Sequence, residues 1–255
     1  MAHESEASAR IAIVREIEAG LSHSLLESER TALGADALAD AAAFIAEAAH
    51  QRRGDEPIVL VDSSKDELKT ASVRRQRLAI INSDMPFLVD SIANCLSSAG
   101  LAIHLLAHPV LMVRRNEAGE IIRLGDHDDA QRESFIYVET DRADARGRRA
   151  LVQELEQTLA HVRAAVRGWR PMIDAMQQDA HRLGPGEGGD LLRWFLKGNV
   201  TQLGHEVRGR DGSVSRAKGI ATFTDEPQLA DSTISAIFAW FDKGHPAPLI
   251  LKSNQ

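Results

Sequence analysis

The sequence has a single cysteine, few aromatic residues and no long apolar run. One cysteine, Cys95, excludes a disulfide framework and agrees with a reducing compartment. No apolar stretch approaches the roughly 20 residues that a membrane-spanning helix needs, and the opening MAHESEASAR lacks the apolar segment of a signal peptide. We therefore expect a cytoplasmic protein that does not bind a membrane.

An excess of charge of one sign is also missing. The net charge of −7 over 255 residues gives no general electrostatic reason to expect a nucleic-acid or anionic-lipid partner. Hydrophobic residues make up 44% of the chain, which is ordinary for a globular protein and argues against wholesale disorder. The length suits one large domain or two small ones.

The N-terminal part, residues 1–56, is predicted to be a helical segment. Within residues 4–50, an alanine-rich run has high helix propensity, and Gly20 and Gly34 interrupt the pattern, so we expect at least two helices. The apolar residues that recur at helical spacing near its start are Ile11, Val14, Ile17 and Leu21.

Residues 57–183 read as an α+β domain with a long C-terminal helix. The pattern predicts strands at 58–61, 78–81, 101–115, 121–124 and 134–139. It also predicts a helix that has Pro86 in its first turn and that Gly100 ends, and a second helix along 151–166. This order is close to the ferredoxin-like βαββαβ arrangement, in which two helices cover one face of a mostly antiparallel sheet.

A glycine-rich segment, residues 184–189, is predicted to link this domain to a second one. It fits the G-x-G-x-x-G dinucleotide pattern literally, but a helix precedes it, Pro185 lies inside it, and Glu187 would repel a phosphate, so the linker interpretation is favoured.

Residues 190–255 are predicted to begin a second small α+β (ACT-like) domain that looks truncated. We expect Asp190 to cap a helix that runs through Leu196. Strands are expected at 202–208, 216–223 and 248–252, with a helix at 233–241.

No catalytic or metal-binding residues are expected. The sequence lacks a G-x-S-x-G elbow, a Walker loop and an H-E-x-x-H motif, and no His/Asn pattern near Cys95 suggests a nucleophile, so a buried structural thiol is the simpler interpretation. His104 and His108 would lie roughly 13 Å apart along one strand, too far to share an ion. The loop 127–129 is interpreted as polar.

The junction between a strand and a helix at residues 82–87 is the most informative local feature. Ser83 or Asp84 is predicted to cap the helix, with Pro86 in its first turn. A helix N-terminus favours an anion such as an amino-acid carboxylate. From the sequence pattern alone, a capped helix without a ligand is the favoured interpretation.

Several ordered segments resemble one family. They are DMPFLVDS at 84–91, residues 100–115 with Ile103-His104 and His108-Pro109-Val110, residues 133–139, and parts of 191–204 and 249–254. They resemble the N-terminal, ACT-type region of the large bacterial NAD-specific glutamate dehydrogenases. In that family the region is a βαββαβ regulatory module often used for amino-acid sensing.

The resemblance implies a parent enzyme that oxidises L-glutamate to 2-oxoglutarate and ammonium with NAD, while this stretch contains no catalytic or cofactor site. It also implies a homo-oligomer and an amino-acid effector. The N–H groups of Met85, Phe87 and Leu88 would receive the effector's carboxylate, and Asn82 or Asp84 would accept from its ammonium group. The alternative is a stand-alone ACT-like amino-acid-binding or scaffold protein.

Overall fold

The computed structural model describes residues 2–63, 69–70, 73–223 and 229–251. The chain forms two compact units, Met1–Ala160 and His161–Gln255. The division falls inside one helix, α5 (Ala145–Leu183), and not at the segment 184–189.

Three helices begin the first unit: α1 (Ala2–Ser24), α2 (Glu27–Leu33) and α3 (Ala35–Ala49). The prediction of at least two helices is confirmed, and Gly34, with φ of 80°, separates α2 from α3. The predicted break at Gly20 is wrong, because Gly20 lies inside α1. A Cβ there would lie 3.0 Å from Cβ of Pro109, so glycine permits the helix to approach the sheet closely.

The sheet of the first unit is antiparallel at every pairing between described strands. Its order is β1-β3-β7-β5-β6, with β2 also paired to β3 and β4 also paired to β7. The strands are β1 (Ile58–Asp62), β2 (Lys69–Thr70), β3 (Val73–Ser83), β4 (Ile103–Ala107), β5 (Val110–Arg115), β6 (Ile121–Leu124) and β7 (Gln131–Asp141).

The predicted single strand at 101–115 is wrong, since β4 ends before Pro109 and β5 begins after it. Proline has no N–H to donate to a ladder, and both strands pair with the same neighbour, β7. The carbonyl of Pro109 still accepts from the N–H of Phe135 at 2.9 Å, so the two strands remain aligned along β7.

The connectivity gives an α+β fold with a ferredoxin-like core, as predicted. β3 leads through helix α4 (Leu88–Ser98) to β4 and β5, and β7 then returns between β3 and these two strands before α5 begins. The outer position beside β3 is filled by β1, which comes before the core in the chain. The edge strand is therefore supplied from the N-terminal side.

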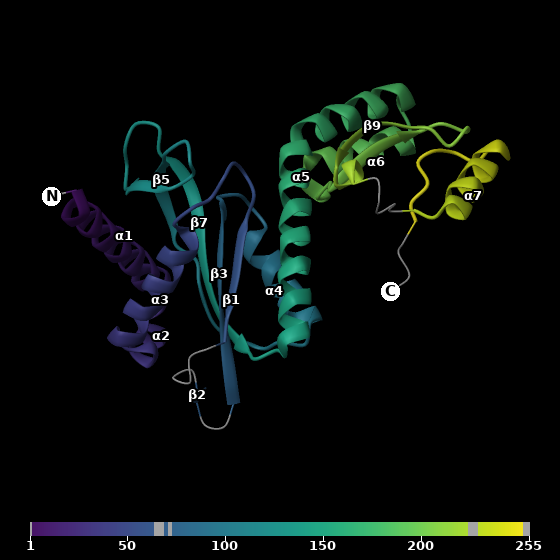
Figure 1. The fold of residues 1–255 in the computed structure, drawn as a ribbon. Coiled ribbons are helices and arrows are strands. Elements are labelled where there is room, and N and C mark those ends of the chain that lie inside the picture. The colour runs from purple at the N-terminus through teal and green to yellow at the C-terminus, as the bar shows by residue number, and fades with distance from the viewer. Residues whose placement is uncertain (1, 64–68, 71–72, 224–228, 252–255) are drawn as a thin grey trace. The chain divides into compact units, whose positions relative to one another are not determined.

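Helices cover both faces of this sheet (Figure 1). α4 and the first-unit part of α5 lie on one face, which confirms the predicted helical layer, and the N-terminal helices lie on the other. Because side chains alternate along a strand, Ala79 and Ile81 of β3 face α1 and α3, whereas Leu78 and Ile80 face the opposite layer. All four residues are fully buried.

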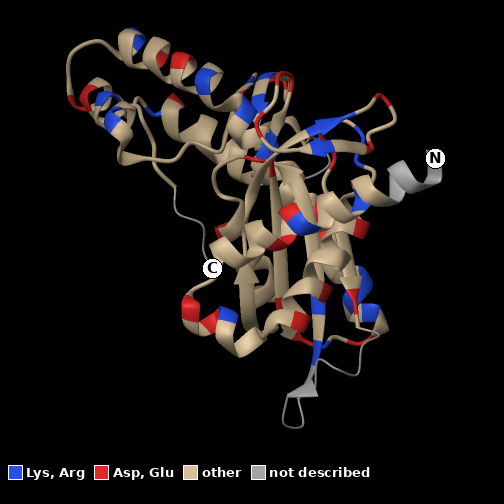
Figure 2. Cartoon of the chain, turned by 90° about the vertical axis from the view of Figure 1, so that its left-hand side faces the viewer, with Lys and Arg blue, Asp and Glu red and all other residues tan. Residues whose placement is uncertain are grey.

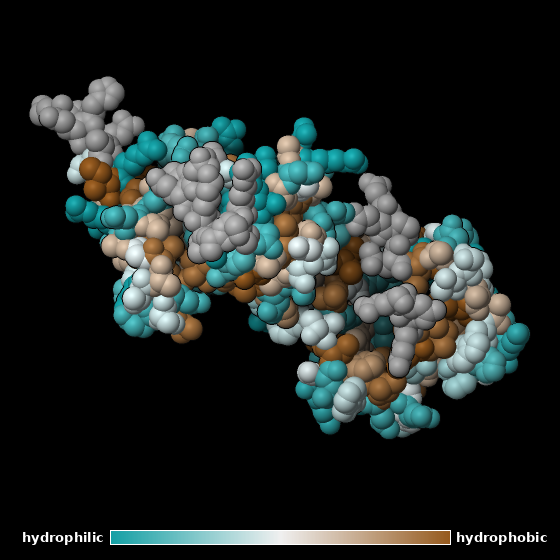
Figure 3. Space-filling view, turned by 90° about the horizontal axis from the view of Figure 1, so that it is seen from below, coloured by the Kyte–Doolittle hydropathy of each residue, from teal (hydrophilic) through white to brown (hydrophobic). Residues whose placement is uncertain are grey.

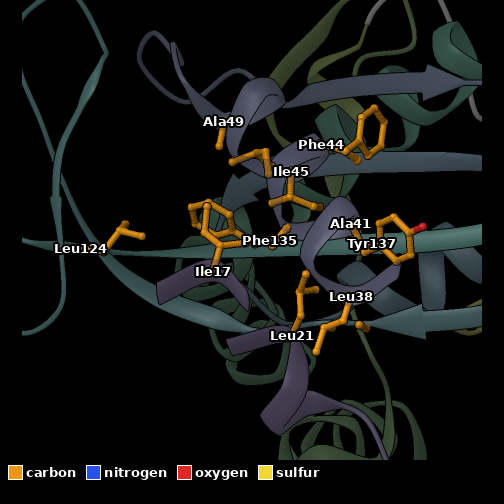
Figure 4. Close-up of a cluster of buried hydrophobic side chains, with 14 of the residues drawn as sticks. Ile17, Leu21, Leu38, Ala41, Phe44, Ile45, Ala49, Leu124, Phe135 and Tyr137 are labelled. Carbon is orange, nitrogen blue, oxygen red and sulfur yellow. The ribbon is translucent and has the colours of Figure 1, made fainter. Parts of the chain in front are cut away.

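The N-terminal helices and the sheet share one apolar core (Figure 4). Ile17 and Leu21 of α1 and Ile45 of α3 pack with Phe135 and the other members of the cluster. Burying such side chains contributes about 1.5–3 kcal/mol each. The N-terminal helices are thus one layer of the first unit, joined to its sheet by a common core.

The second unit contains the remainder of α5, α6 (Glu187–Trp194), the π-helical turn Phe195–Asn199, the hairpin β8 (Gly204–Arg208) and β9 (Val214–Gly219), the 3-10 turn Ile220–Thr222 and α7 (Asp231–Asp242). The helix predicted at 233–241 is confirmed as α7, and a hairpin is present as predicted. The second strand predicted at 216–223 is wrong at its end, because β9 stops at Gly219 and the next three residues form the 3-10 turn. Large apolar side chains stay exposed here, including Trp194, Val200, Leu203, Val207 and Val214. The view in Figure 3 shows brown apolar surface beside teal and white residues.

Two further local predictions for this unit are wrong. Helix α6 begins at Glu187, so residues 187–189 are helical and Asp190 does not cap the helix. The Asp190 N–H donates to the Gly186 carbonyl at 2.9 Å, which places Asp190 in the first turn. Residues 248–251 form no strand, since no described strand pairs with them, and Lys252 lies outside the described residues.

Candidate functional site

The predicted junction site lies between the end of β3 at Ser83 and the start of α4 at Leu88. Phe87 precedes the helix with φ of 72°, a left-handed conformation that is unusual for a bulky residue. The predicted cap by Ser83 or Asp84 is wrong, because α4 has no side-chain cap hydrogen bond. Pro86 lies in the turn before the helix and not in its first turn.

The side chains of Ser83 and Asp84 are engaged elsewhere, which explains the missing cap. The Ser83 hydroxyl accepts from Nη2 of Arg52 at 2.8 Å. The Asp84 carboxylate accepts from the Ser134 hydroxyl at 3.0 Å and pairs with Nη2 of Arg132 at 2.9 Å. The Asp84 N–H donates to the Arg132 carbonyl at 3.0 Å, so Asp84 extends the contact between β3 and β7.

Asn82 is the most buried polar member of this site. Its side chain is fully enclosed, its Nδ2 donates to the Ser83 carbonyl at 3.2 Å, and its Oδ1 has no partner among the described residues. Asn82 stands opposite Ser134 in the ladder, and the Ser134 hydroxyl binds Asp84. The structure therefore brings Asn82 and Asp84 to one end of β3.

The predicted N–H donors are only partly in place. Met85 is half-buried in the connecting turn, Phe87 is 49% exposed, and Leu88 is buried as the first residue of α4. The first N–H groups of a helix have no partner inside it. The Ser91 N–H donates to the carbonyl of Phe87, the residue that caps α4, so the N–H groups of both Phe87 and Leu88 belong to that set.

His108 adds a titratable group near this junction. Burial lowers the pKa of its imidazole, and the nearby negative charge of Asp84 opposes that shift. Its Nε2 is buried without a partner in the part of the chain that the structure describes.

A second cluster, which the sequence analysis missed, joins Arg52, Arg115 and Glu133. The two carboxylate oxygens of Glu133 accept from Arg115: Oε1 from Nε at 2.8 Å and Oε2 from Nη2 at 2.8 Å. The Oε1 atom also lies 3.2 Å from Nη1 of Arg52. The side chains of Arg52 and Glu133 are 4% exposed and that of Arg115 is 12% exposed. We call these three residues the arginine–glutamate cluster.

The same cluster holds the surrounding backbone. Arg115 Nη1 donates to the carbonyls of Ala49 and Gly119 at 2.9 and 2.7 Å, and Arg52 Nε donates to the Glu56 carbonyl at 2.9 Å. Burial lowers the pKa of the Arg52 guanidinium, and the charge of Glu133 opposes that shift. These bonds join the end of α3, the β5–β6 hairpin and β7.

A cavity of about 330 Å³ adjoins the arginine–glutamate cluster. In Figure 2, basic residues on strands and acidic residues in loops lie close together at the strand ends. One signal in the sequence points to the cluster: Glu133 shares its strand face with the buried Phe135 and Tyr137, and an inward-facing charge needs a partner. The cavity is lined by Arg52, Arg53, Gly54, Val113, Arg115, Asn116, Glu117, Gly119, Asp129, Gln131 and Glu133.

The second unit has a cavity of similar size between the C-terminal half of α5 and the β8–β9 hairpin. Asp174 and Asp179 of the helix and Arg216 and Lys218 of the hairpin are among its lining residues. His205 also lines it, and the Nδ1 of His205 has no partner among the residues with described positions.

The glycine-rich segment does not fit a dinucleotide. It follows the helix α5 and not a strand, and Glu187 and Asp190 lie in the first turn of α6, where a pyrophosphate would meet negative charge. Over the described ranges, no group of three or more His, Cys, Asp or Glu side chains is arranged to hold a metal ion. Within the same ranges, no helix is both long and apolar enough to cross a bilayer.

Cys95 is buried on the inner side of α4, as predicted. Burial and, second, the charge of Glu154 raise the pKa of its thiol to about 11. A thiol with such a pKa is protonated at neutral pH and is a poor nucleophile.

Comparison with known proteins identifies the family. The domain family described as "Glutamate dehydrogenase, ACT1 domain" matches residues 21–155. An NAD-specific glutamate dehydrogenase of Pseudomonas aeruginosa is 30% identical over 167 residues, which cover 60% of this chain and 10% of that protein. One of Halomonas elongata is 31% identical over 157 residues, covering 53% of this chain and 10% of the relative.

The chain thus spans about a tenth of the length of the curated relatives that it matches. The matched region contains β1, the ferredoxin-like core and both sites of the first unit. The chain belongs to the glutamate dehydrogenase family, and residues 21–155 match the ACT1 domain of that family.

Proposed function

We propose that this chain is a non-catalytic regulatory and assembly region of a large NAD-dependent glutamate dehydrogenase. The parent enzyme converts L-glutamate, NAD⁺ and water to 2-oxoglutarate, ammonium and NADH, and the residues that bind NAD and perform the chemistry lie in other parts of it. The observation that carries this proposal is the ACT1 match over residues 21–155, in a chain that covers a tenth of its relatives.

The proposal predicts that the isolated chain does not oxidise glutamate. We expect no NADH absorbance at 340 nm when the purified protein is incubated with L-glutamate and NAD⁺, and no NAD-dependent rise in its melting temperature. A full-length relative, such as the Pseudomonas aeruginosa enzyme, is the positive control. NADH formation by the isolated chain would contradict a non-catalytic role.

Sensing of an amino acid at the β3–α4 junction is the regulatory part of the proposal. A free helix N-terminus favours a carboxylate, Asn82 has an unused buried acceptor, and backbone strain of the kind seen at Phe87 concentrates at ligand sites. In this arrangement the N–H groups of Met85, Phe87 and Leu88 receive the carboxylate, and Asn82 or Asp84 accepts from the ammonium group.

Calorimetry with a panel of L-amino acids tests this site. Asp84→Ala removes the proposed ammonium acceptor, and Asp36→Ala, at an exposed position on α3, is the matched control. We expect one amino acid to bind the wild type and the control, and to bind Asp84→Ala at least tenfold more weakly. Equal binding to both variants would exclude this site.

The assembly part of the proposal predicts self-association in the cytoplasm. Exposed apolar side chains in the second unit and an outer edge on β1 without a described partner strand are surfaces that globular proteins normally cover. Sedimentation velocity at several concentrations is expected to show a homo-oligomer. A monomer at the highest concentration would contradict self-association of this region.

A further inference from the structure

We propose that the cavity beside the arginine–glutamate cluster binds a small carboxylate anion through the guanidinium groups of Arg52 and Arg115. This site differs from the β3–α4 junction, and the proposal does not depend on the function proposed above. Its basis is the hydrogen-bonding capacity of the cluster, its burial and the shape of the space next to it.

The two guanidinium groups have more donors than the structure uses. A guanidinium has five N–H donors. Among described residues, Arg52 directs three interactions, to Glu56, Ser83 and Glu133, and Arg115 directs four, to Ala49, Gly119 and both oxygens of Glu133. Donors remain on both groups, in side chains that are at most 12% exposed.

The charge of the cluster is also only partly balanced by its own members. Two guanidinium groups share the single carboxylate of Glu133, and Asp55 contributes a further negative charge near Arg52. A buried arginine is best stabilised by an acceptor that meets two of its N–H groups together, and a carboxylate has that geometry.

The space beside the cluster has the right size and access. The cavity of about 330 Å³ is at the lower end of the range for small-ligand pockets. Arg53 lies at its exposed margin and attracts anions, while Glu117 and Asp129 line the same cavity and would meet a positive group on the ligand. Asp129 has φ of 67°, a strained conformation for a residue other than glycine.

Gln131 offers a direct test because it lines the cavity, is exposed and lies on β7 two residues from Glu133. We would measure binding of sodium glutarate and sodium L-glutamate by calorimetry and by thermal shift, against sodium chloride of equal ionic strength. Glutarate tests the carboxylate alone, and L-glutamate adds the ammonium group. Saturable binding of either supports the proposal and identifies the ligand class.

Substitutions of opposite charge at position 131 distinguish an electrostatic effect on binding from an effect on folding. Gln131→Glu is expected to weaken binding three- to tenfold and Gln131→Lys to strengthen it by about the same factor, from the Coulomb energy of one charge several ångströms away at intermediate dielectric. Gln153→Glu, an exposed change on α5, is the matched control and is expected to bind as the wild type does.

Arg115→Lys keeps the charge but removes the fork of donors, and it is expected to weaken binding at least tenfold. Binding of neither compound at 10 mM would overturn the proposal, as would equal affinity of the Gln131→Glu and Gln131→Lys proteins. Because Asp84→Ala leaves this cavity intact, binding here is expected to be unchanged in that variant. Failure of the junction site is thereby distinguished from failure of this one.

Discussion

The guanidinium group of Arg77 lies 4.1 Å from the centroid of the Phe44 ring, so a residue of β3 stacks on a residue of α3. The same group pairs with Asp40 of α3 at 2.6 Å and with Asp62 of β1 at 2.8 Å. Arg77 is buried, and it joins the N-terminal helical layer to the central and edge strands. This contact places the helices before residue 57 in the same unit as the sheet.

Loss of the Arg77 contacts is expected to destabilise the first unit. We expect Arg77→Ala to lower the free energy of unfolding by about 2–4 kcal/mol, because it removes a buried cation that stacks on Phe44 and pairs with two carboxylates. Arg30→Ala is the matched control, since Arg30 forms an exposed pair with Glu27 whose loss costs about 0–0.5 kcal/mol. Urea denaturation of both variants measures the difference, and equal effects would contradict this role of Arg77.

Alanine substitutions at two glycines with positive φ, Gly100 and Gly119, distinguish the cost of backbone strain from the cost of a steric clash. A Cβ at Gly119, with φ of 86°, would lie 2.3 Å from the carbonyl oxygen of Arg52, whereas a Cβ at Gly100, with φ of 71°, meets nothing within 4 Å. Gly100→Ala is therefore expected to cost about 1–2 kcal/mol for the left-handed conformation alone. Gly119→Ala is expected to cost at least about 2 kcal/mol more, because the backbone of Arg52 must move.

Denaturation curves of the two alanine variants, measured side by side, provide the comparison. Gly119→Ala is also expected to disturb the cavity proposed to bind a carboxylate, since the Gly119 carbonyl accepts from both Arg52 and Arg115. A Gly119→Ala protein as stable as the Gly100→Ala protein would show that the hairpin relaxes freely around this position.

Local patterns predicted the elements whose own residues determine them. The stripe of apolar residues identified α4, and the strands β1, β6 and β7 were expected within three residues of their ends. Only the apolar centre of β3, residues 78–81, was expected, because its first residues are polar. The pattern could show that the N-terminal helices have an apolar face, but it could not show that this face covers the sheet. That depends on contacts such as Arg77 with Phe44, between residues 33 positions apart in the sequence.

The candidate sites also combine features that neighbouring residues determine with features that depend on distant contacts. The junction at 82–88 was identified because its residues are consecutive, but the cap was wrong, since Arg52 and Ser134 engage Ser83 and Asp84 from distant segments. The arginine–glutamate cluster joins three segments between residues 52 and 133, so no local motif could reveal it. Only the inward position of Glu133 on an alternating strand was visible in the sequence.

The imidazole of His108 is expected to make the protein sensitive to acid. Burial lowers its pKa, so below an unfolded value of about 6.5 the unfolded chain binds a proton that the folded chain does not. Stability is therefore lost as the pH falls below 6.5 toward the lowered pKa. The slope of the unfolding free energy against pH between 7.5 and 5 measures this loss. In His108→Asn that slope is expected to be smaller by the equivalent of up to one bound proton.

His108→Gln, a second replacement that does not titrate, provides the control for that measurement and is expected to give the same slope as His108→Asn. A His108→Asn protein with the full wild-type slope would place the acid sensitivity elsewhere.

Cys95 is expected to make the protein sensitive to alkali and to resist alkylation. Burial beside Glu154 raises its pKa from the ordinary 9.0 to about 11, so the native thiol is protonated at pH 8 and reacts slowly with iodoacetamide, whereas the thiol of the urea-unfolded chain reacts quickly. Because the unfolded thiol loses its proton first, stability is expected to decline as the pH rises from about 9 to about 11. This decline is expected to be absent in Cys95→Ala.

Glu154→Gln is expected to accelerate native alkylation, since it removes a negative charge next to the thiol. Native and unfolded protein with equal alkylation rates at pH 8 would contradict a buried thiol with a raised pKa.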